Sequence, residues 1–335
     1  MLGTLSVASA AFVLGALVSL GASWILVTRL ERIGERFGLS EALLGLLTAL
    51  AADTPEITAA VTALVHHQRT VGAGVVIGSN AFNLAALLGL GAIVAGRIEL
   101  HRKVVLLGGS VALGIALLCM GAVTKVIDPP TGLGIGLAVM LAYAVVLSRP
   151  VYAVRWKAMP SRWARWLASA VDEEELELGA GIRPHRAEPR DFVTAVIALA
   201  AVIVASVEME RGASSLGANY HVPSVVLGGL VLAAVTSMPN AVAAVYLARH
   251  GRGAAAFSTA LNSNAVNVVA GLLLPATFLG VSSPTGSTLL IAGTYLGLTL
   301  LTLVLAFTWR GLRQGAGWLI VAGYAALVVA LLATS

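Results

Sequence analysis

Two acidic residues, Asp53 and Glu56, lie in the middle of an otherwise apolar stretch of this sequence. The run reads Leu50-Ala-Ala-Asp53-Thr54-Pro55-Glu56. A carboxylate placed inside a bilayer costs several kcal/mol unless it has a partner. No Lys or Arg stands in the middle of any apolar stretch. The expected partner of these carboxylates is therefore a bound cation or a proton.

A second run has the same form but no acid. It reads Ala234-Val-Thr236-Ser237-Met238-Pro239-Asn240. Proline removes a backbone donor and breaks a helix, so Pro55 and Pro239 each predict a broken helix near the middle of the membrane. The carbonyl groups freed at such a break can be satisfied by a bound cation.

Each run is followed by a polar pair in the next apolar stretch. Ser79 and Asn83 are four residues apart, as are Ser263 and Asn267, so each pair lies on one face of a helix. The donors gathered in this way are carboxylate, hydroxyl, amide and carbonyl oxygens, without His or Cys. Oxygen ligands suit hard ions such as Ca²⁺, Na⁺ or Mg²⁺ and disfavour Zn²⁺ or Cu⁺.

The elements that must position these groups are membrane helices. The chain has 335 residues, of which 58% are hydrophobic and only 11% are charged, a composition typical of an integral membrane protein. A span needs about 20 apolar residues. We predict ten spans, at 5–28, 40–66, 72–96, 103–123, 131–148, 191–209, 222–248, 254–280, 286–309 and 316–333. The first run has no basic start, so we expect it to be a span that is retained rather than a cleaved signal peptide.

The basic residues predict the orientation of these spans in the cell membrane. With both termini outside, all but three of the 21 Lys and Arg residues fall in cytoplasmic connections, and the exceptions are Arg69, Lys125 and Arg211. Such a bias is typical of the positive-inside rule. The net charge of +5 is therefore explained by topology, and we expect no nucleic-acid partner.

The sequence also repeats itself. A shift of 184 residues places Pro55 on Pro239 and the segment 79–81 on 263–265, both of which read Ser-Asn-Ala. Each copy would hold five spans, an odd number, so the second copy enters the bilayer in the opposite sense. We therefore predict an all-α membrane protein of two inverted five-helix repeats, an architecture of many secondary transporters whose sites lie near the midplane.

These paired motifs resemble the cation/Ca²⁺ exchanger superfamily, in particular bacterial sodium/calcium exchanger-like proteins. The resemblance rests on Ala52–Glu56 with Gly78–Asn83, and again on Thr236–Asn240 with Asn262–Asn267. It implies alternating access in which inward Na⁺ or H⁺ flux drives Ca²⁺ out. The ligand positions that it implies are Ala52, Asp53, Glu56, Ser79, Asn83, Thr236, Ser237, Asn240, Ser263 and Asn267.

This chain departs from the family pattern of a Thr-Ser-Leu-Pro-Glu-like run in both repeats. Ala52 and Asp53 replace the first Thr and Ser, and Asn240 replaces the second Glu. Both acids of the expected metal site, Asp53 and Glu56, therefore come from one half. If both ionise, their charge balances one Ca²⁺; if they share a proton, coupling to H⁺ becomes plausible.

Structural roles compete with each of these ligand assignments. Glu56 could be a helix-terminus charge in a water-filled crevice, and Asp53 could cap the second half of the broken helix. The Ser and Asn pairs could be hydrogen-bonding contacts between helices. Repetition at the same spacing favours ligation.

We divide the chain into a first exchanger-type repeat at 1–148, a cytoplasmic loop at 149–190 and a second repeat at 191–335. The stretch 151–167 is basic and rich in Trp, which indicates a helix lying on the membrane surface in contact with lipid. The acidic run 172–177 is read as a solvated segment, and a regulatory Ca²⁺ contact there remains an alternative.

The leading function is exchange of Ca²⁺ for Na⁺ or H⁺, with these ions as cargo and no cofactor. Alternatives are an H⁺-coupled transporter of Mg²⁺, Na⁺ or K⁺, and a non-transporting degenerate copy suggested by Asn240. An anion carrier is expected to have a basic residue in the middle of a span, and none is evident in this sequence. An intramembrane enzyme would need a Ser–Lys, Ser–His or His-Glu-x-x-His motif, and the spans hold none, so we expect no enzymatic activity.

Overall fold

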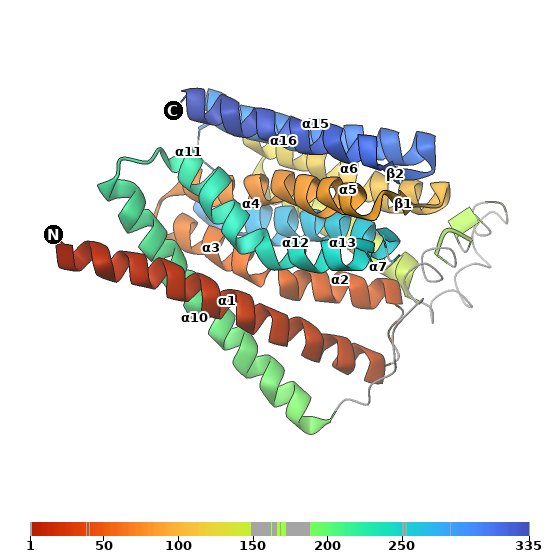
Figure 1. The fold of residues 1–335 in the computed structure, drawn as a ribbon, viewed down its shortest axis with the longest axis horizontal. Coiled ribbons are helices and arrows are strands. Elements are labelled where there is room, and N and C mark those ends of the chain that lie inside the picture. Colours follow the sequence, from red (N-terminus) through yellow and green to blue (C-terminus); the bar gives the residue numbers. More distant parts are fainter. Residues whose placement is uncertain are drawn as a thin grey trace.

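The computed structural model describes residues 2–37, 39, 41–148, 162, 166–167, 169–171, 188–249, 251, 253–281 and 283–334. Almost all of this chain is helical (Figure 1). The elements of the first repeat are α1 (Leu2–Arg36), α2 (Glu41–Ala52), α3 (Thr54–Val65), α4 (Arg69–Asn83), the π-helix η1 (Leu84–Leu90), α5 (Gly91–Ala95), β1 (Arg97–Glu99), α6 (Arg102–Val123) and α7 (Pro129–Leu147). Those of the second are α10 (Pro189–Asn219), α11 (Ser224–Val226), η3 (Leu227–Leu232), α12 (Ala233–Arg249), α13 (Gly253–Val266), η4 (Asn267–Leu273), α14 (Leu274–Leu279), α15 (Gly286–Trp309), β2 (Gly311–Arg313) and α16 (Gln314–Thr334).

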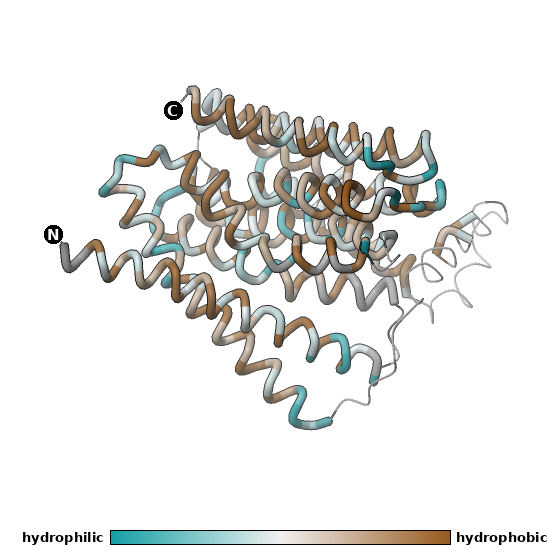
Figure 2. The backbone as a smooth tube through the Cα atoms, viewed as in Figure 1, coloured by the Kyte–Doolittle hydropathy of each residue, from teal (hydrophilic) through white to brown (hydrophobic). Residues whose placement is uncertain are grey.

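The apolar helices agree with a membrane protein. In the described part of the chain, 8 helices are long and apolar enough to cross a bilayer, and a bent pair at Pro239 would make 9. The remaining predicted span, 40–66, consists of the two shorter helices α2 and α3, which meet at Asp53. Figure 2 shows apolar residues along the lengths of the helices and hydrophilic ones at turns, such as the lower ends of α1 and α10.

The 184-residue repeat of the sequence is also a repeat of the fold. Adding 184 to the bounds of α1, α4, η1, α6 and α7 gives those of α10, α13, η4, α15 and α16 to within a few residues. In Figure 1, α1 runs away from the end that carries both termini, and α10 returns toward it. Equivalent helices thus run in opposite directions, which confirms the inverted repeat.

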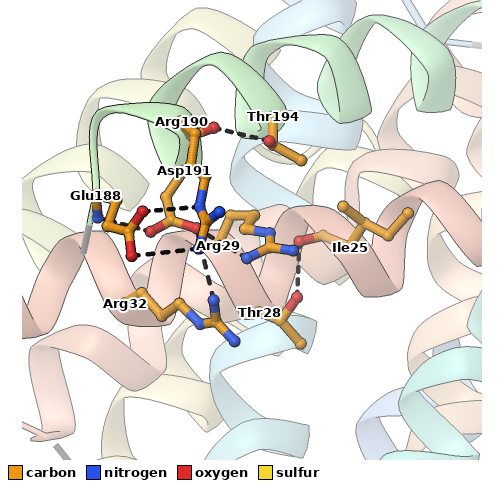
Figure 3. A network of polar contacts seen from close by, with 8 residues as sticks. All are labelled: Ile25, Thr28, Arg29, Arg32, Glu188, Arg190, Asp191 and Thr194. Carbon is orange, nitrogen blue, oxygen red and sulfur yellow. Dashed lines mark hydrogen bonds and ion pairs between the residues drawn. The ribbon is translucent and has the colours of Figure 1, made fainter. Parts of the chain in front are cut away.

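Helices α1 and α10 lie side by side along one edge of the molecule (Figure 1). The hydroxyls of Ser19 and Ser206 share a buried hydrogen bond of 2.7 Å between them. At their far end, Arg29 donates to the Asp191 carboxylate at 2.8 Å, and Arg32 lies 3.6 Å from the same oxygen (Figure 3). Asp191 also accepts from the Glu188 backbone and so closes a capping box at the start of α10. The pair is therefore tied by polar contacts near its middle and at one end.

The two repeats meet where α4 crosses η3. Small residues let helix backbones approach closely in membranes. A Cβ atom added to Gly78 would lie 2.2 Å from the carbonyl oxygen of Gly229, and one added to Gly228 would lie 2.3 Å from that of Val71. Only glycine fits at this crossing, so these positions set the spacing between the halves of the molecule.

Most of the predicted loop is outside the described residues. This applies to 149–161, 163–165, 168 and 172–187, which include most of the basic, Trp-rich stretch and the acidic run. Of the rest, Trp166, Leu167 and Val171 pack against Leu107 of α6 and Leu147 of α7. The domain boundaries at 148 and 190 remain predictions.

Candidate cation-binding site

The two acids are placed by a one-residue interruption of the helix. Asp53 separates α2 from α3, yet its N–H donates to Ala49 at 2.9 Å and its carbonyl accepts from Ile57 at 2.9 Å. The helical path is therefore nearly continuous at Pro55. At the equivalent place in the second repeat, the helix axis bends by 55° between Met238 and Asn240. Helix distortions occur at both predicted prolines, but they differ in form.

Each carboxylate is hydrogen-bonded to a neutral side chain of the other repeat. Ser237 donates its hydroxyl to Glu56 Oε1 at 2.9 Å, and Asn240 donates its amide to Asp53 Oδ1 at 2.9 Å. All four side chains are at most 3% exposed. Since Asp53 corresponds to Ser237 and Glu56 to Asn240, these two contacts are related by the pseudo-twofold symmetry of the repeats. The acids of the first repeat accept these hydrogen bonds, whereas the equivalent residues of the second repeat donate them.

A third donor connects Asp53 to the following helices. Ser263 donates its hydroxyl to Asp53 Oδ1 at 2.6 Å and accepts from the Asn83 amide at 3.1 Å. The polar groups that bond to the two carboxylates are thus neutral, namely Ser237, Asn240 and Ser263. Nothing in this set supplies the positive charge that two ionised acids would need.

Four asparagines hold the centre of the site together. Asn80 donates to the backbone oxygen of Asn264 at 3.0 Å, and Asn264 donates to that of Asn80 at 3.1 Å. Asn83 donates to Asn264 Oδ1 at 3.1 Å, and Asn267 donates to Asn80 Oδ1 at 3.3 Å. Both pairs of bonds are symmetric under the repeat. Asn80 and Asn264, which our ligand prediction omitted, are therefore the groups that join α4 to α13, and the 184-residue shift already carried that signal.

Several buried oxygens at this place have no hydrogen-bond donor. They are Asp53 Oδ2, Glu56 Oε2, Asn83 Oδ1 and Asn267 Oδ1. Buried polar atoms are rarely left without a partner in folded proteins. Two carboxylate and two amide oxygens form a donor set that suits a hard cation. Of the four sequence motifs, the set draws on Ala52–Glu56, Gly78–Asn83 and Asn262–Asn267, and not on Thr236–Asn240.

The π-helices η1 and η4 begin at this level of the membrane. Asn83 immediately precedes η1, and Asn267 is the first residue of η4. π-helical turns inside α-helices occur frequently at functional sites. The two π-helices occupy equivalent positions in the two repeats. The widened turn is therefore a feature of the repeated fold next to these asparagines, and not of one local sequence.

Two predicted ligands are directed elsewhere. Thr236 donates its hydroxyl to Leu232 of its own helix at 2.9 Å. Ser79 donates to the Ala233 backbone across the repeat interface at 3.4 Å. Both are fully buried beside the site, but their protons bond to backbone carbonyls and not to the carboxylates. Ala52 has no side-chain oxygen to offer.

The fold and the candidate site together define a class of protein: an all-α membrane transporter of two inverted repeats, with buried oxygen atoms of polar side chains collected between them. The sodium/calcium exchanger protein family matches residues 7–151 and 191–333. The chain therefore belongs to the sodium/calcium exchanger protein family, and it is a multi-pass membrane antiporter for cations.

Solved structures share this fold at low sequence identity. The sodium-calcium exchanger NCX_Mj has a TM-score of 0.61 and 20% identity, with 97% of this chain and 98% of that one covered. The H⁺/Ca²⁺ exchanger CAX has a TM-score of 0.72 and 12% identity, with 96% and 82% covered. YfkE has a TM-score of 0.65 and 14% identity, with 95% and 91% covered. At these identities the likeness is one of fold.

A curated relative is similar over a shorter stretch. The putative antiporter CaxA of Alkalimonas amylolytica is 37% identical over 84 residues. These residues are 25% of this chain and 26% of that relative, so the chain matches about a quarter of its length.

Proposed function

We propose that this antiporter carries Ca²⁺ in exchange for Na⁺ or H⁺ by alternating access across the cell membrane, with both termini outside and the loop 149–190 in the cytoplasm. The observation that carries the proposal is the set of four buried oxygens without donors, two of them from Asp53 and Glu56. Their ionised charge of −2 equals and opposes that of one Ca²⁺. The relatives named for Na⁺/Ca²⁺ and H⁺/Ca²⁺ exchange support the same cargo.

The proposed site consists of the oxygens of Asp53, Glu56, Asn83 and Asn267, held by Ser237, Asn240 and Ser263. Thr236 and Ser79 lie beside these oxygens without contacting the ion directly. A rotation of either side chain would bring its hydroxyl toward the ion. Pro55 lies between the two acids, and Pro239 lies at the 55° bend of the helix that carries Ser237 and Asn240. This assignment includes every motif of both repeats.

The buried position of the acids explains how exchange would be coupled. Two ionised carboxylates enclosed without a counter-charge are strongly unfavourable, because desolvation of each ion costs several kcal/mol. The site can close around Ca²⁺, or around monovalent cations or protons that neutralise the same charge. It resists closing when empty and ionised. Such a site moves one kind of cargo only when the other has been exchanged for it.

The test is a flux measurement on the full chain reconstituted in vesicles. An imposed H⁺ or Na⁺ gradient is expected to drive ⁴⁵Ca²⁺ uptake against its own gradient, and an ionophore that collapses the driving gradient should abolish it. Separate H⁺ and Na⁺ arms identify the coupling ion. Uptake that responds to neither gradient would overturn the proposal. Competition with Mg²⁺, Na⁺ and K⁺ tests the alternative cargoes.

Replacement of Asn240 tests the asymmetry of the site. Asn240 Nδ2 donates to Asp53 at 2.9 Å. Asn240→Glu removes this donor and adds a third carboxylate, so the neutral site must hold one more positive charge. We expect the midpoint of the pH profile of ⁴⁵Ca²⁺ uptake to move by about one unit or more. Asn240→Gln keeps the amide and is the matched control. A profile that coincides with that of the control would place Asn240 outside the site.

A further inference from the structure

A basic cavity lies at the end of the molecule opposite the termini, where two connections meet. The strand β1 follows α5, β2 follows α15, and the two pair antiparallel with Ile98 opposite Leu312. Leu100 N–H donates to Arg310 at 3.3 Å, and Gln314 N–H donates to Gly96 at 3.0 Å. These bonds join the two repeats through backbone contacts, and residues of both connections line the cavity. Figure 1 shows the two strands at the end opposite the termini.

The lining of this cavity is strongly cationic. Its volume is about 360 Å³, and the charged side chains that line it are Arg97, Arg102, Lys103, Arg310 and Glu99. Four cations face one carboxylate there. Glu99 is 80% exposed and lies 3.5 Å from Arg97, so most of its charge is screened by water. The cavity therefore carries a net positive charge suited to an anion.

One of these cations is held in place by packing. Arg102 donates from Nε to the Phe307 carbonyl at 3.2 Å, and its guanidinium lies over the Phe307 ring at 5.0 Å from the ring centre. The hydrogen bond uses Nε, so the two terminal nitrogens are directed elsewhere. A planar, oriented guanidinium of this kind suits a phosphate oxygen pair.

The two helices next to the cavity, α6 and α15, carry exposed apolar residues. Leu106 follows Arg102 by one helical turn on α6 and is 45% exposed. On α15, Leu300 and Val304 are four residues apart and are 42% and 56% exposed. Trp309 ends that helix at the level of the cavity and is 39% exposed, a position typical of the membrane interface. Exposed apolar residues thus lie on both of the packed helices, α6 and α15, that adjoin the cationic cavity.

We propose that this cavity binds the phosphate of an anionic phospholipid head group, with the acyl chains lying along α6 and α15. A free phosphate compound shares the chemistry of the head group but has no acyl chains to contact the apolar residues of α6 and α15. The site lies between connections that belong to different repeats, so a bound head group would bridge the two halves of the transporter at this end.

The proposal is tested by lipid retention. The full chain is purified in detergent, mixed with equal amounts of phosphatidylglycerol and phosphatidylcholine, and examined by native mass spectrometry. We expect one phosphatidylglycerol to be retained preferentially. Arg310→Gln with Arg97→Gln should lower that retention about tenfold or more, since each basic residue contributes about 1 kcal/mol. The matched control is Arg69→Gln with Lys125→Gln, which removes two charges at the other side of the membrane and should change nothing.

Two further measurements decide between the outcomes. Thermal unfolding of each purified variant without added lipid shows whether it is folded; should the double variant unfold early, Arg310→Gln alone is measured, with an expected loss of about fivefold. Inorganic phosphate is titrated in a parallel arm. Stabilisation by phosphate that equals the stabilisation by phosphatidylglycerol would overturn the lipid assignment, as would equal retention of the two lipids or a loss shared by the control variant.

Discussion

Glu56→Gln is expected to abolish gradient-driven Ca²⁺ transport while leaving the protein folded. The substitution removes one of the two acids whose oxygens lack donors but keeps an oxygen for the Ser237 hydroxyl, which now lies 2.9 Å from Oε1. Removing one partner of a buried charge pair costs about 3–5 kcal/mol, which corresponds to a loss in affinity of about 10²- to 4 × 10³-fold. Ca²⁺ binding and ⁴⁵Ca²⁺ uptake in vesicles measure the effect.

The control for this substitution is Glu208→Gln, which also removes one acid. Glu208 is on α10, is half exposed, and pairs with Arg211 at 3.0 Å. Since an exposed ion pair contributes about 0–1 kcal/mol, the control should transport as the wild type does. In the absence of Ca²⁺, the Glu56→Gln protein should unfold at the same temperature as the wild type or higher, because a buried acid has been replaced by a neutral amide. Wild-type uptake by Glu56→Gln would remove Glu56 from the cation site.

Gly78→Ala is expected to prevent the two repeats from packing. The added methyl group would lie 2.2 Å from the Gly229 oxygen and 2.7 Å from its carbonyl carbon, which are backbone atoms that cannot rotate away. The helices α4 and η3 must then separate, and overpacking of a well-packed core costs about 1–3 kcal/mol or more. Because Ser79 and Asn83 are on the same helix, the site would be displaced as well. We expect a lower unfolding temperature in detergent and loss of transport.

Gly114→Ala is the matched control because a methyl group there would have nothing within 4 Å. It is also in the middle of a helix, α6, where alanine is preferred over glycine by about 1 kcal/mol. The control should therefore be as stable as the wild type or slightly more stable. If Gly78→Ala unfolds at the same temperature as this control, the close approach of α4 and η3 is not required for the fold.

The architecture could be predicted from the sequence because each membrane span can be recognised from its own stretch of residues. Apolar runs of about 20 residues must be helices in a bilayer, since all backbone groups have to bond within the segment. The 184-residue shift indicated the inverted repeat, and the structure confirms it: α6 and α15 begin at positions that are 184 residues apart. The interruption predicted in the span 40–66 is present too, since this span is divided at Asp53 into α2 and α3.

The form of the helix breaks could not be predicted in the same way. Pro55 and Pro239 occupy equivalent positions, yet the first repeat shows a one-residue interruption and the second a bend of 55°. A proline removes one donor in either case, and neighbouring helices decide how the freed groups are satisfied. The π-helices η1, η3 and η4 were likewise unpredicted, because their widened turns depend on packing against other helices.

By itself, the sequence determined which residues carry the chemistry: two acids beside one proline, neutral donors beside the other, and paired Ser and Asn residues 184 positions apart. Only the tertiary structure decided which side chains form hydrogen bonds with one another. It joined each acid to a neutral donor of the opposite repeat and placed Asn80 and Asn264 at the centre of the site. It also left Asp53 Oδ2 and Glu56 Oε2 without donors. The physical reason is that spacing along one helix fixes a face, whereas a cation site needs oxygens from several helices, whose approach is set by glycines at their crossing.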